Sequence, residues 1–147
     1  MKRPTRWQLD AFVAAVHQYL GQPRWEIVPI KERDTDEGVT DDDVWAETRY
    51  DTQGMFVQLW WSDVVLKELP IAKVREVAVH EAMHAIHSEI DFVTEDVSLV
   101  MHSYEWSALS RAYHRARERM VAQLAHALSD SREVKRLWKK HCGDGGS

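Results

Sequence analysis

Residues 74–87 read VREVAVHEAMHAIH, and residues 80–84 within this stretch form the motif H-E-x-x-H. Positions i and i+4 of a helix lie on one face, about one turn apart, so His80 and His84 can each aim an imidazole nitrogen at a single ion. Glu81 lies one position along, where it can accept a proton from a water on the metal and pass it to a leaving amine. The stretch therefore predicts two zinc ligands and a catalytic general base within one helical turn.

The residues that flank the motif indicate a buried helix, predicted over residues 71–88, because they are uncharged and mostly apolar. They are Val77, Ala78, Val79, Ala82, Met83, Ala85 and Ile86. A His-Glu-His trio in such a helix is unfavourable unless something binds the imidazoles, which favours a metal site over a polar stripe of ordinary surface histidines. His87 is assigned to the surface or to a supporting position, because three histidines along one straight helix diverge from a common ion.

The residues after the motif exclude one subclass of zinc peptidase. A metzincin continuation would place glycine at position 87 and histidine at position 90, whereas the chain has His87 and Ile90. A third protein ligand must therefore come from elsewhere in the chain.

The rest of the chain predicts a single domain of mixed secondary structure. In chain order the expected elements are a helix over 5–20, a strand over 23–30, an acidic loop over 31–43, a hairpin of strands over 44–51 and 55–61, a short helical turn over 62–69, the motif helix, a loop over 89–96, a long helix over 97–128 and a last helix over 131–141. The predicted fold is α+β: a small three-stranded antiparallel sheet backed by an N-terminal helix, the H-E-x-x-H helix and a long C-terminal helix that carries a glutamate. The domain is predicted to span residues 1–142, with residues 143–147 as a flexible tail.

The composition is that of a soluble globular protein, with 44% hydrophobic and 29% charged residues among 147. No apolar run is long enough to span a bilayer, and the lone Cys142 can form no internal disulfide, so a reducing, cytoplasmic setting is expected. The formal net charge is −5, yet residues 111–140 hold nine basic and three acidic side chains. Few aromatic residues accompany them, so a solvated helix face is favoured over a nucleic-acid site. Neither a nucleic acid nor a membrane is expected as a partner.

The segment from about Trp25 to Ser129 resembles the small single-domain gluzincin-type zinc metallopeptidases, including phage and actinobacterial proteins of that type. The sharp motif is HEAMH at residues 80–84. The resemblance implies a Zn²⁺ cofactor, a peptide or protein substrate, and a later helix that contributes a glutamate ligand. It also implies that the strand MFVQLWW, residues 55–61, borders the cleft and pairs with an extended substrate.

Two glutamates compete for the position of third zinc ligand. Glu105 follows His84 by 21 residues, close to the spacing of larger gluzincins, and sits among apolar residues. Glu118 follows His84 by 34 residues and opens the segment ERMVAQLAHAL, which resembles the glutamate helix of the small phage-type proteins. Glu95 and Asp96 are instead expected to cap the long helix. The sequence favours Glu118, and Glu105 stays open as the alternative.

The predicted function is hydrolysis of peptide bonds, with His80, His84 and a glutamate holding zinc and Glu81 acting as general base through a metal-bound water. One alternative is a zinc-binding module without catalysis, serving as a regulatory or structural component of a phage or its host. Another is a SprT-like, nucleic-acid-associated protease, in which His102 would be the third ligand. The substrate preference and the oligomeric state are left open.

Overall fold

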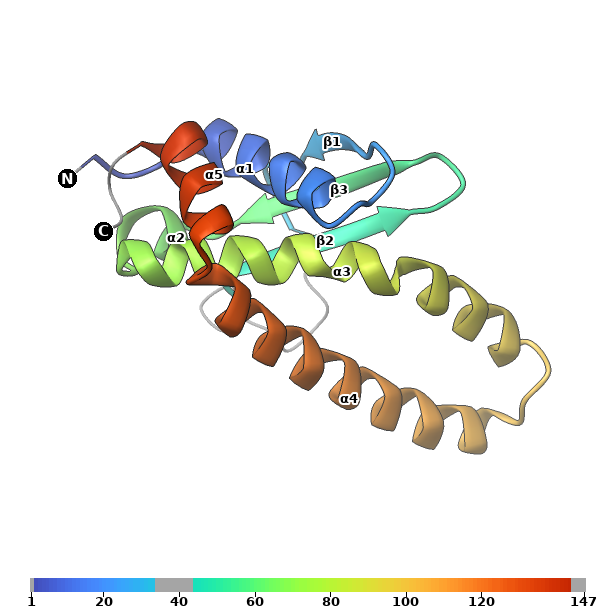
Figure 1. Ribbon diagram of the computed structural model, residues 1–147. Helices are drawn as coiled ribbons and strands as arrows, with labels where there is room; N and C mark the ends of the chain where they lie inside the picture. Colours follow the sequence, from blue (N-terminus) through green and yellow to red (C-terminus); the bar gives the residue numbers. More distant parts are fainter. Residues whose placement is uncertain (1, 34–43, 144–147) are drawn as a thin grey trace.

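The computed structural model describes residues 2–33 and 44–143 of the chain (Figure 1). The elements in chain order are α1 (Arg6–Tyr19), β1 (Glu26–Pro29), β2 (Ala46–Asp51), β3 (Phe56–Trp61), α2 (Asp63–Lys67), α3 (Ile71–Ser98), α4 (Ser103–Ser129) and α5 (Arg132–Cys142). The α+β class is therefore confirmed.

The three strands form a sheet in the order β1-β3-β2, so β3 is central and β2 lies at an edge. The predicted hairpin is confirmed: β2 and β3 are antiparallel, and Gly54 N donates a 2.6 Å hydrogen bond to Asp51 Oδ1 in the turn between them. The expectation of a purely antiparallel sheet is wrong, because β1 runs parallel to β3. The returning strand of the hairpin lies between β1 and β2, and it runs in the same direction as β1.

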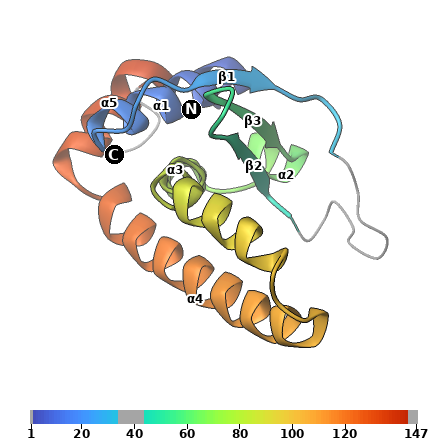
Figure 2. The ribbon, with the colours of Figure 1, turned by 90° about the vertical axis from the view of Figure 1, so that its right-hand side faces the viewer.

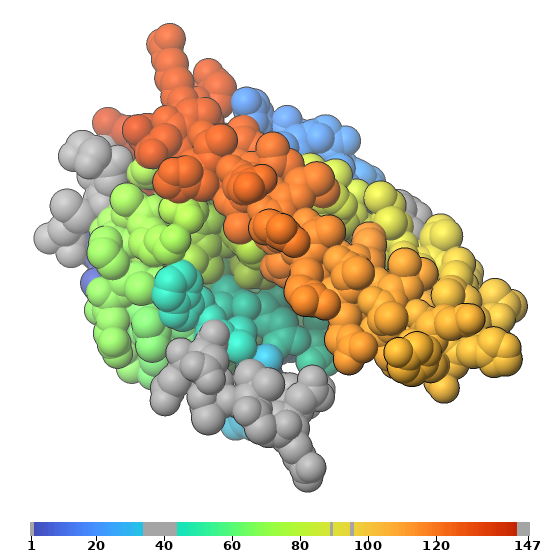
Figure 3. Space-filling view, turned by 90° about the horizontal axis from the view of Figure 1, so that it is seen from below, coloured from blue at the N-terminus to red at the C-terminus, as the bar shows by residue number. Residues whose placement is uncertain are grey.

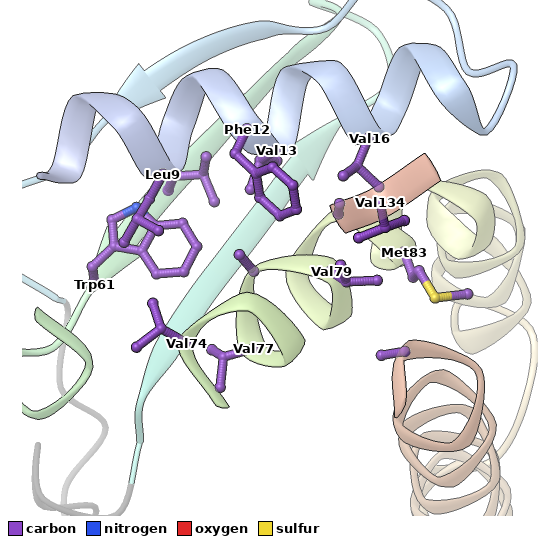
Figure 4. Packing of buried hydrophobic residues seen from close by; sticks show 14 of the residues in the cluster. Leu9, Phe12, Val13, Val16, Trp61, Val74, Val77, Val79, Met83 and Val134 are labelled. Atoms are coloured by element: carbon purple, nitrogen blue, oxygen red, sulfur yellow. The ribbon is translucent and has the colours of Figure 1, made fainter. Parts of the chain in front are cut away.

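The hydrophobic core lies between one face of the sheet and the two helices α1 and α3 (Figures 2 and 4). A capping box of Thr5 and Gln8 starts α1, as the predicted helix start at residue 5 requires. The buried core residues include Leu9, Phe12, Val13 and Val16 of α1, Val57, Leu59 and Trp61 of β3, and Val74, Ala78 and Ala82 of α3. Alternate β3 residues thus face the helices, and α3 is held against the sheet by its apolar side.

The helix that carries the H-E-x-x-H motif is longer than the sequence predicts. It continues to Ser98, so the loop predicted over residues 89–96 is helical, and α4 begins only at Ser103. Glu95 and Asp96 therefore lie in the last turns of α3, and their predicted role as N-terminal caps is wrong. The segment contains no glycine or proline to end the helix, and its apolar residues keep helical spacing.

Helices α3 and α4 form a long antiparallel hairpin that extends away from the sheet (Figure 1). At the end opposite the connecting loop, the buried Arg75 of α3 reaches the last turn of α4. Its Nε donates a 2.8 Å hydrogen bond to the backbone oxygen of Ser129, and its guanidinium lies 3.1 Å from Asp130 Oδ1. This buried contact fixes how far along α3 each residue of α4 lies.

Parts of two predictions lie outside the described residues: most of the acidic loop over 31–43, and residues 144–147 of the predicted tail. Gly143, with φ of 88°, follows the end of α5 as a left-handed cap residue. Among the described residues, no helix has the length and the apolar character that crossing a membrane requires.

Candidate metal centre

His80 and His84 lie one turn apart on the face of α3 that looks toward α4 and the cleft. Their ring centroids are 4.9 Å apart, with an angle of 75° between the ring planes. Potential ligand atoms of His80, Glu81 and His84 all lie within 4.8 Å of one another. The helix thus converges the motif's side chains on one small volume, as its spacing predicts.

Glu118 of α4 reaches both imidazoles. Its Oε2 lies 3.2 Å from His80 Nε2, and its Oε1 lies 3.5 Å from His84 Nε2. Ligand atoms at zinc–ligand distances of 2.0–2.1 Å stand about 3.3 Å apart at the corners of a tetrahedron. Two imidazoles and a carboxylate at these separations therefore fit a three-ligand zinc site with one open position.

Glu105, the alternative third ligand, is not brought to the histidines. It is exposed in the first turn of α4, about 20 Å further along the helix axis from Glu118 at 1.5 Å per residue. His102, the ligand expected of a SprT-like protease, is the residue that precedes α4 and is also exposed. His87 is buried rather than at the surface, which leaves the supporting position as its predicted place.

The charges of the three candidate ligands suit a cation. The hydrogen bond with His80 lowers the pKa of Glu118 to about 2, so this carboxylate is ionised. Burial lowers the pKa of His84 to about 4, which keeps its imidazole neutral and able to bind a metal. Burial also opposes the protonation of His80, yet its hydrogen bond with Glu118 and the charge of Glu81 raise its pKa overall. The ionised carboxylate of Glu118 thus supplies negative charge where the histidines meet.

Glu81 is buried beside the candidate ligands and contacts the edge strand. Its Oε2 accepts a 2.8 Å hydrogen bond from the Thr48 hydroxyl of β2. Burial raises the pKa of Glu81 to about 7, against the lowering effects of His80 and Thr48. A carboxylate with a pKa near neutrality, held in one orientation, has the properties of a general base.

A second contact from β2 fixes the backbone of the motif helix. The Tyr50 hydroxyl donates a 3.0 Å hydrogen bond to the backbone oxygen of Glu81. It also lies 2.7 Å from Nε2 of the buried His17 in α1. Because the tyrosine proton goes to the carbonyl, His17 donates to the tyrosine oxygen, and burial lowers the pKa of His17 to about 4. Strand β2, supported by His17 of α1, therefore holds Glu81 in place.

The candidate site opens into a cleft of about 880 Å³ between β2, α3 and α4. In Figure 3 the surface of β2 is visible between the start of α3 and α4. The cleft is lined along β2 by consecutive residues from Val44 to Gln53. The resemblance implies that residues 55–61 hold this position, and that implication is wrong: Phe56–Trp61 form β3, whose two edges are both paired with neighbouring strands.

A chain of polar contacts supports Glu118 from the side away from the histidines. Arg117 lies 3.2 Å from Glu118 Oε1 and 2.7 Å from Asp91 Oδ2 of α3. The Tyr113 hydroxyl donates a 2.7 Å hydrogen bond to the other oxygen of Asp91. The sequence did not reveal this network, because residue 91 was expected in a loop rather than facing α4.

Replacing Asp91 with asparagine is expected to weaken zinc binding by roughly 10-fold, because residues that orient a ligand typically contribute 10–100-fold to metal affinity. The dissociation constant, measured by competition with a chromophoric chelator, checks this. Asp96→Asn is the matched control, since Asp96 is an exposed aspartate near the end of the same helix. Equal affinities for the two variants would contradict the assigned role of Asp91.

No protein-family model, no curated protein and no solved structure matches the chain. A functional assignment therefore depends on the arrangement of the residues in the cleft.

Proposed function

We propose that the protein is a zinc-dependent metallopeptidase of the gluzincin-like type. The observation that carries this proposal is the position of Glu118, whose two carboxylate oxygens lie 3.2 Å and 3.5 Å from the Nε2 atoms of His80 and His84. The two histidines come from one turn of α3, whereas Glu118 of α4 follows His84 by 34 residues in the chain. Two imidazoles and one carboxylate are a donor set that catalytic zinc sites use, which supports the proposal.

In this proposal His80, His84 and Glu118 would hold the ion at the wall of the cleft. Zinc, when bound, supplies a Lewis acid that polarises a carbonyl group and acidifies water. Glu81 takes a proton from the attacking water and delivers it to the leaving amine. Thr48 and Tyr50 keep Glu81 oriented toward the cleft during this transfer.

The substrate we propose is an extended peptide that lies along β2. Among the described residues β2 is an edge strand of the sheet, and an extended peptide can add to an edge strand as a further strand. The same strand supplies Thr48, which contacts Glu81, so a peptide on β2 would pass beside the general base. We place this activity in the cytoplasm, because the lone Cys142 suits a reducing setting.

The direct test measures metal content and cleavage on the same sample. Purified protein is expected to contain about one zinc ion per chain and to cleave an unstructured substrate such as casein or a mixed peptide library. Removing the metal with a chelator should abolish cleavage, and adding back one equivalent of zinc should restore it.

Two outcomes would contradict the proposal in different ways. Protein that folds normally but binds no zinc would rule out the zinc-dependent functions, catalytic or not. Protein that holds zinc but cleaves nothing in the library would favour the non-catalytic zinc-binding module.

A further inference from the structure

The helical walls of the cleft continue past the candidate ligands toward the end of α4. Val77 lies one turn before His80 on α3, and Ala122 lies one turn after Glu118 on α4. Both residues line the cleft. Because α3 and α4 run antiparallel (Figure 1), the two positions lie on the same side of the candidate ligands, displaced along the helices by about 4.5 Å and 6 Å.

Two contacts between α3 and α4 bracket this part of the cleft. Glu118 Oε2 lies 3.2 Å from His80 Nε2 on one side, and His126 Nδ1 lies 3.4 Å from Glu76 Oε2 on the other. The valine and the alanine each lie between these two contacts along their own helix. They are therefore at the same level of the hairpin.

The segment that leads into β2 supplies a third apolar side chain at this end of the cleft. Trp45 is 39% exposed and lines the cleft. The Nζ atom of Lys73 lies 5.6 Å from the centre of its ring, and Lys73 is one turn before Val77 on α3. This cation–π contact places the indole beside the first turns of α3. Trp45, Val77 and Ala122 are here called the apolar end of the cleft.

The cleft has a different character on the other side of the candidate ligands. Past His84, α3 contributes Ser88 and Asp91, α4 contributes Arg117, and Phe92 lies beside them. Asp91 and Arg117 form an ion pair of 2.7 Å. The two ends therefore suit different side chains, and the apolar end suits an uncharged, apolar one.

Ala122 sets the size of the apolar end, because its side chain is a single methyl group on an exposed position of α4. Val77 is only 7% exposed, so it offers a nearly closed apolar surface on the α3 side. A bulky apolar side chain of a peptide that lies along β2 can bury its surface against these residues.

We propose that the apolar end of the cleft binds a bulky apolar side chain of the substrate, within two residues of the bond that is cleaved. This inference rests on the proposed peptidase function, because it takes the candidate metal centre as the place of cleavage. Residues of an extended peptide are about 3.3 Å apart, so a displacement of about 4.5–6 Å corresponds to the first or second residue from that bond. Ala122 is the residue that determines which side chains fit.

Two pools of peptides with acetylated and amidated ends test the proposal. The pools are the same mixture except at one central position, which is leucine in the first pool and glycine in the second. The wild-type protein is expected to cleave the leucine pool roughly 10-fold faster or more at low peptide concentration, since burial of a leucine side chain is worth a factor of this order. The cleaved bonds, identified by mass spectrometry, should lie within two residues of the leucine and always on the same side of it.

Ala122→Phe is expected to lower the ratio of the two cleavage rates to about one, because the larger side chain fills the space that the leucine would occupy. Ala116→Phe is the matched control, since Ala116 is an exposed alanine of the same helix and does not line the cleft. It should keep the wild-type ratio. Circular dichroism and zinc content of each variant show whether the fold and the metal centre are intact.

A binding measurement separates this proposal from the proposed function. Zinc-loaded Glu81→Gln protein should bind the leucine pool more tightly than the glycine pool, and adding Ala122→Phe should remove the difference. Equal cleavage of the two pools by the wild type, or an unchanged ratio in Ala122→Phe, would overturn the apolar preference and leave the peptidase function standing.

If the wild type cleaves neither pool while the leucine preference appears in binding, the peptidase function fails and the binding site stands. Failure to cleave or bind either pool would overturn both proposals.

Discussion

Replacing Glu118 with alanine is expected to weaken zinc binding by more than about 100-fold, the upper range for loss of a residue that only supports a ligand. The side chain reaches both His80 and His84, so its removal takes away one of three protein donors. Two imidazoles on one helical turn would remain, and four-coordinate zinc would need two waters to complete its shell. The zinc dissociation constant, measured by chelator competition, reports this loss without any assay of activity.

Glu105→Ala is the matched control for this change, because it removes a glutamate from the same helix at an exposed position. It should leave zinc affinity at the wild-type value. If Glu105→Ala lost zinc while Glu118→Ala retained it, the third ligand would be Glu105, and α4 would have to shift along α3 by several turns. If both variants bound zinc with the wild-type affinity, neither glutamate would be a ligand.

Replacing Glu81 with glutamine is expected to lower the rate of peptide cleavage by roughly 10²–10⁴-fold, the usual contribution of a positioned general base. Glutamine keeps the size of the side chain and an oxygen that can accept the hydrogen bond from Thr48, but it cannot take up a proton in the reaction. Zinc content should stay at about one ion per chain, because Glu81 is not among the proposed ligands.

The control for Glu81 is Glu76→Gln, which alters another carboxylate that lines the same cleft. Glu76 forms ion pairs with Lys73 at 2.8 Å and with His126 at 3.4 Å rather than with His80 or His84, so its variant should cleave at a rate close to that of the wild type. Cleavage by Glu81→Gln at the wild-type rate, with zinc bound, would remove Glu81 from the mechanism. Loss of zinc from Glu81→Gln would instead make it a ligand.

The sequence predicted the α3 part of the site because that part is local. His80, Glu81 and His84 lie within two turns of one helix, and helical geometry alone places them together. The approach of Glu118 depends on the packing of two long helices, which no local spacing encodes. The segment ERMVAQLAHAL favoured Glu118 over Glu105 only by resemblance, and its role as a ligand stays a prediction until its affinity is measured.

The wrong predictions about the fold have related causes. Residues 89–96 were expected to form a loop, yet they contain neither glycine nor proline, and the helix continues through them. That error hid Asp91 and its contact with Arg117. The order of the strands in the sheet could not be predicted either, because the sequence of a hairpin does not show which of its two strands pairs with the third strand. The resemblance implied that residues 55–61 border the cleft, whereas β3 within them is the central strand and β2 lies at the edge.

The contact of Arg75 with the end of α4 has a consequence for insertions and deletions in this chain. The buried side chain of Arg75 sets the position of Glu118 along α3 from one end of the hairpin. The short connection from Leu99 to His102 joins the two helices at the other end. Lengthening a flexible connection costs little free energy, since the entropy of closing a loop grows only slowly with its length. The connection can therefore change in length between related chains while Glu118 keeps its place, whereas a residue added between Glu118 and Ser129 would turn the carboxylate away from both histidines.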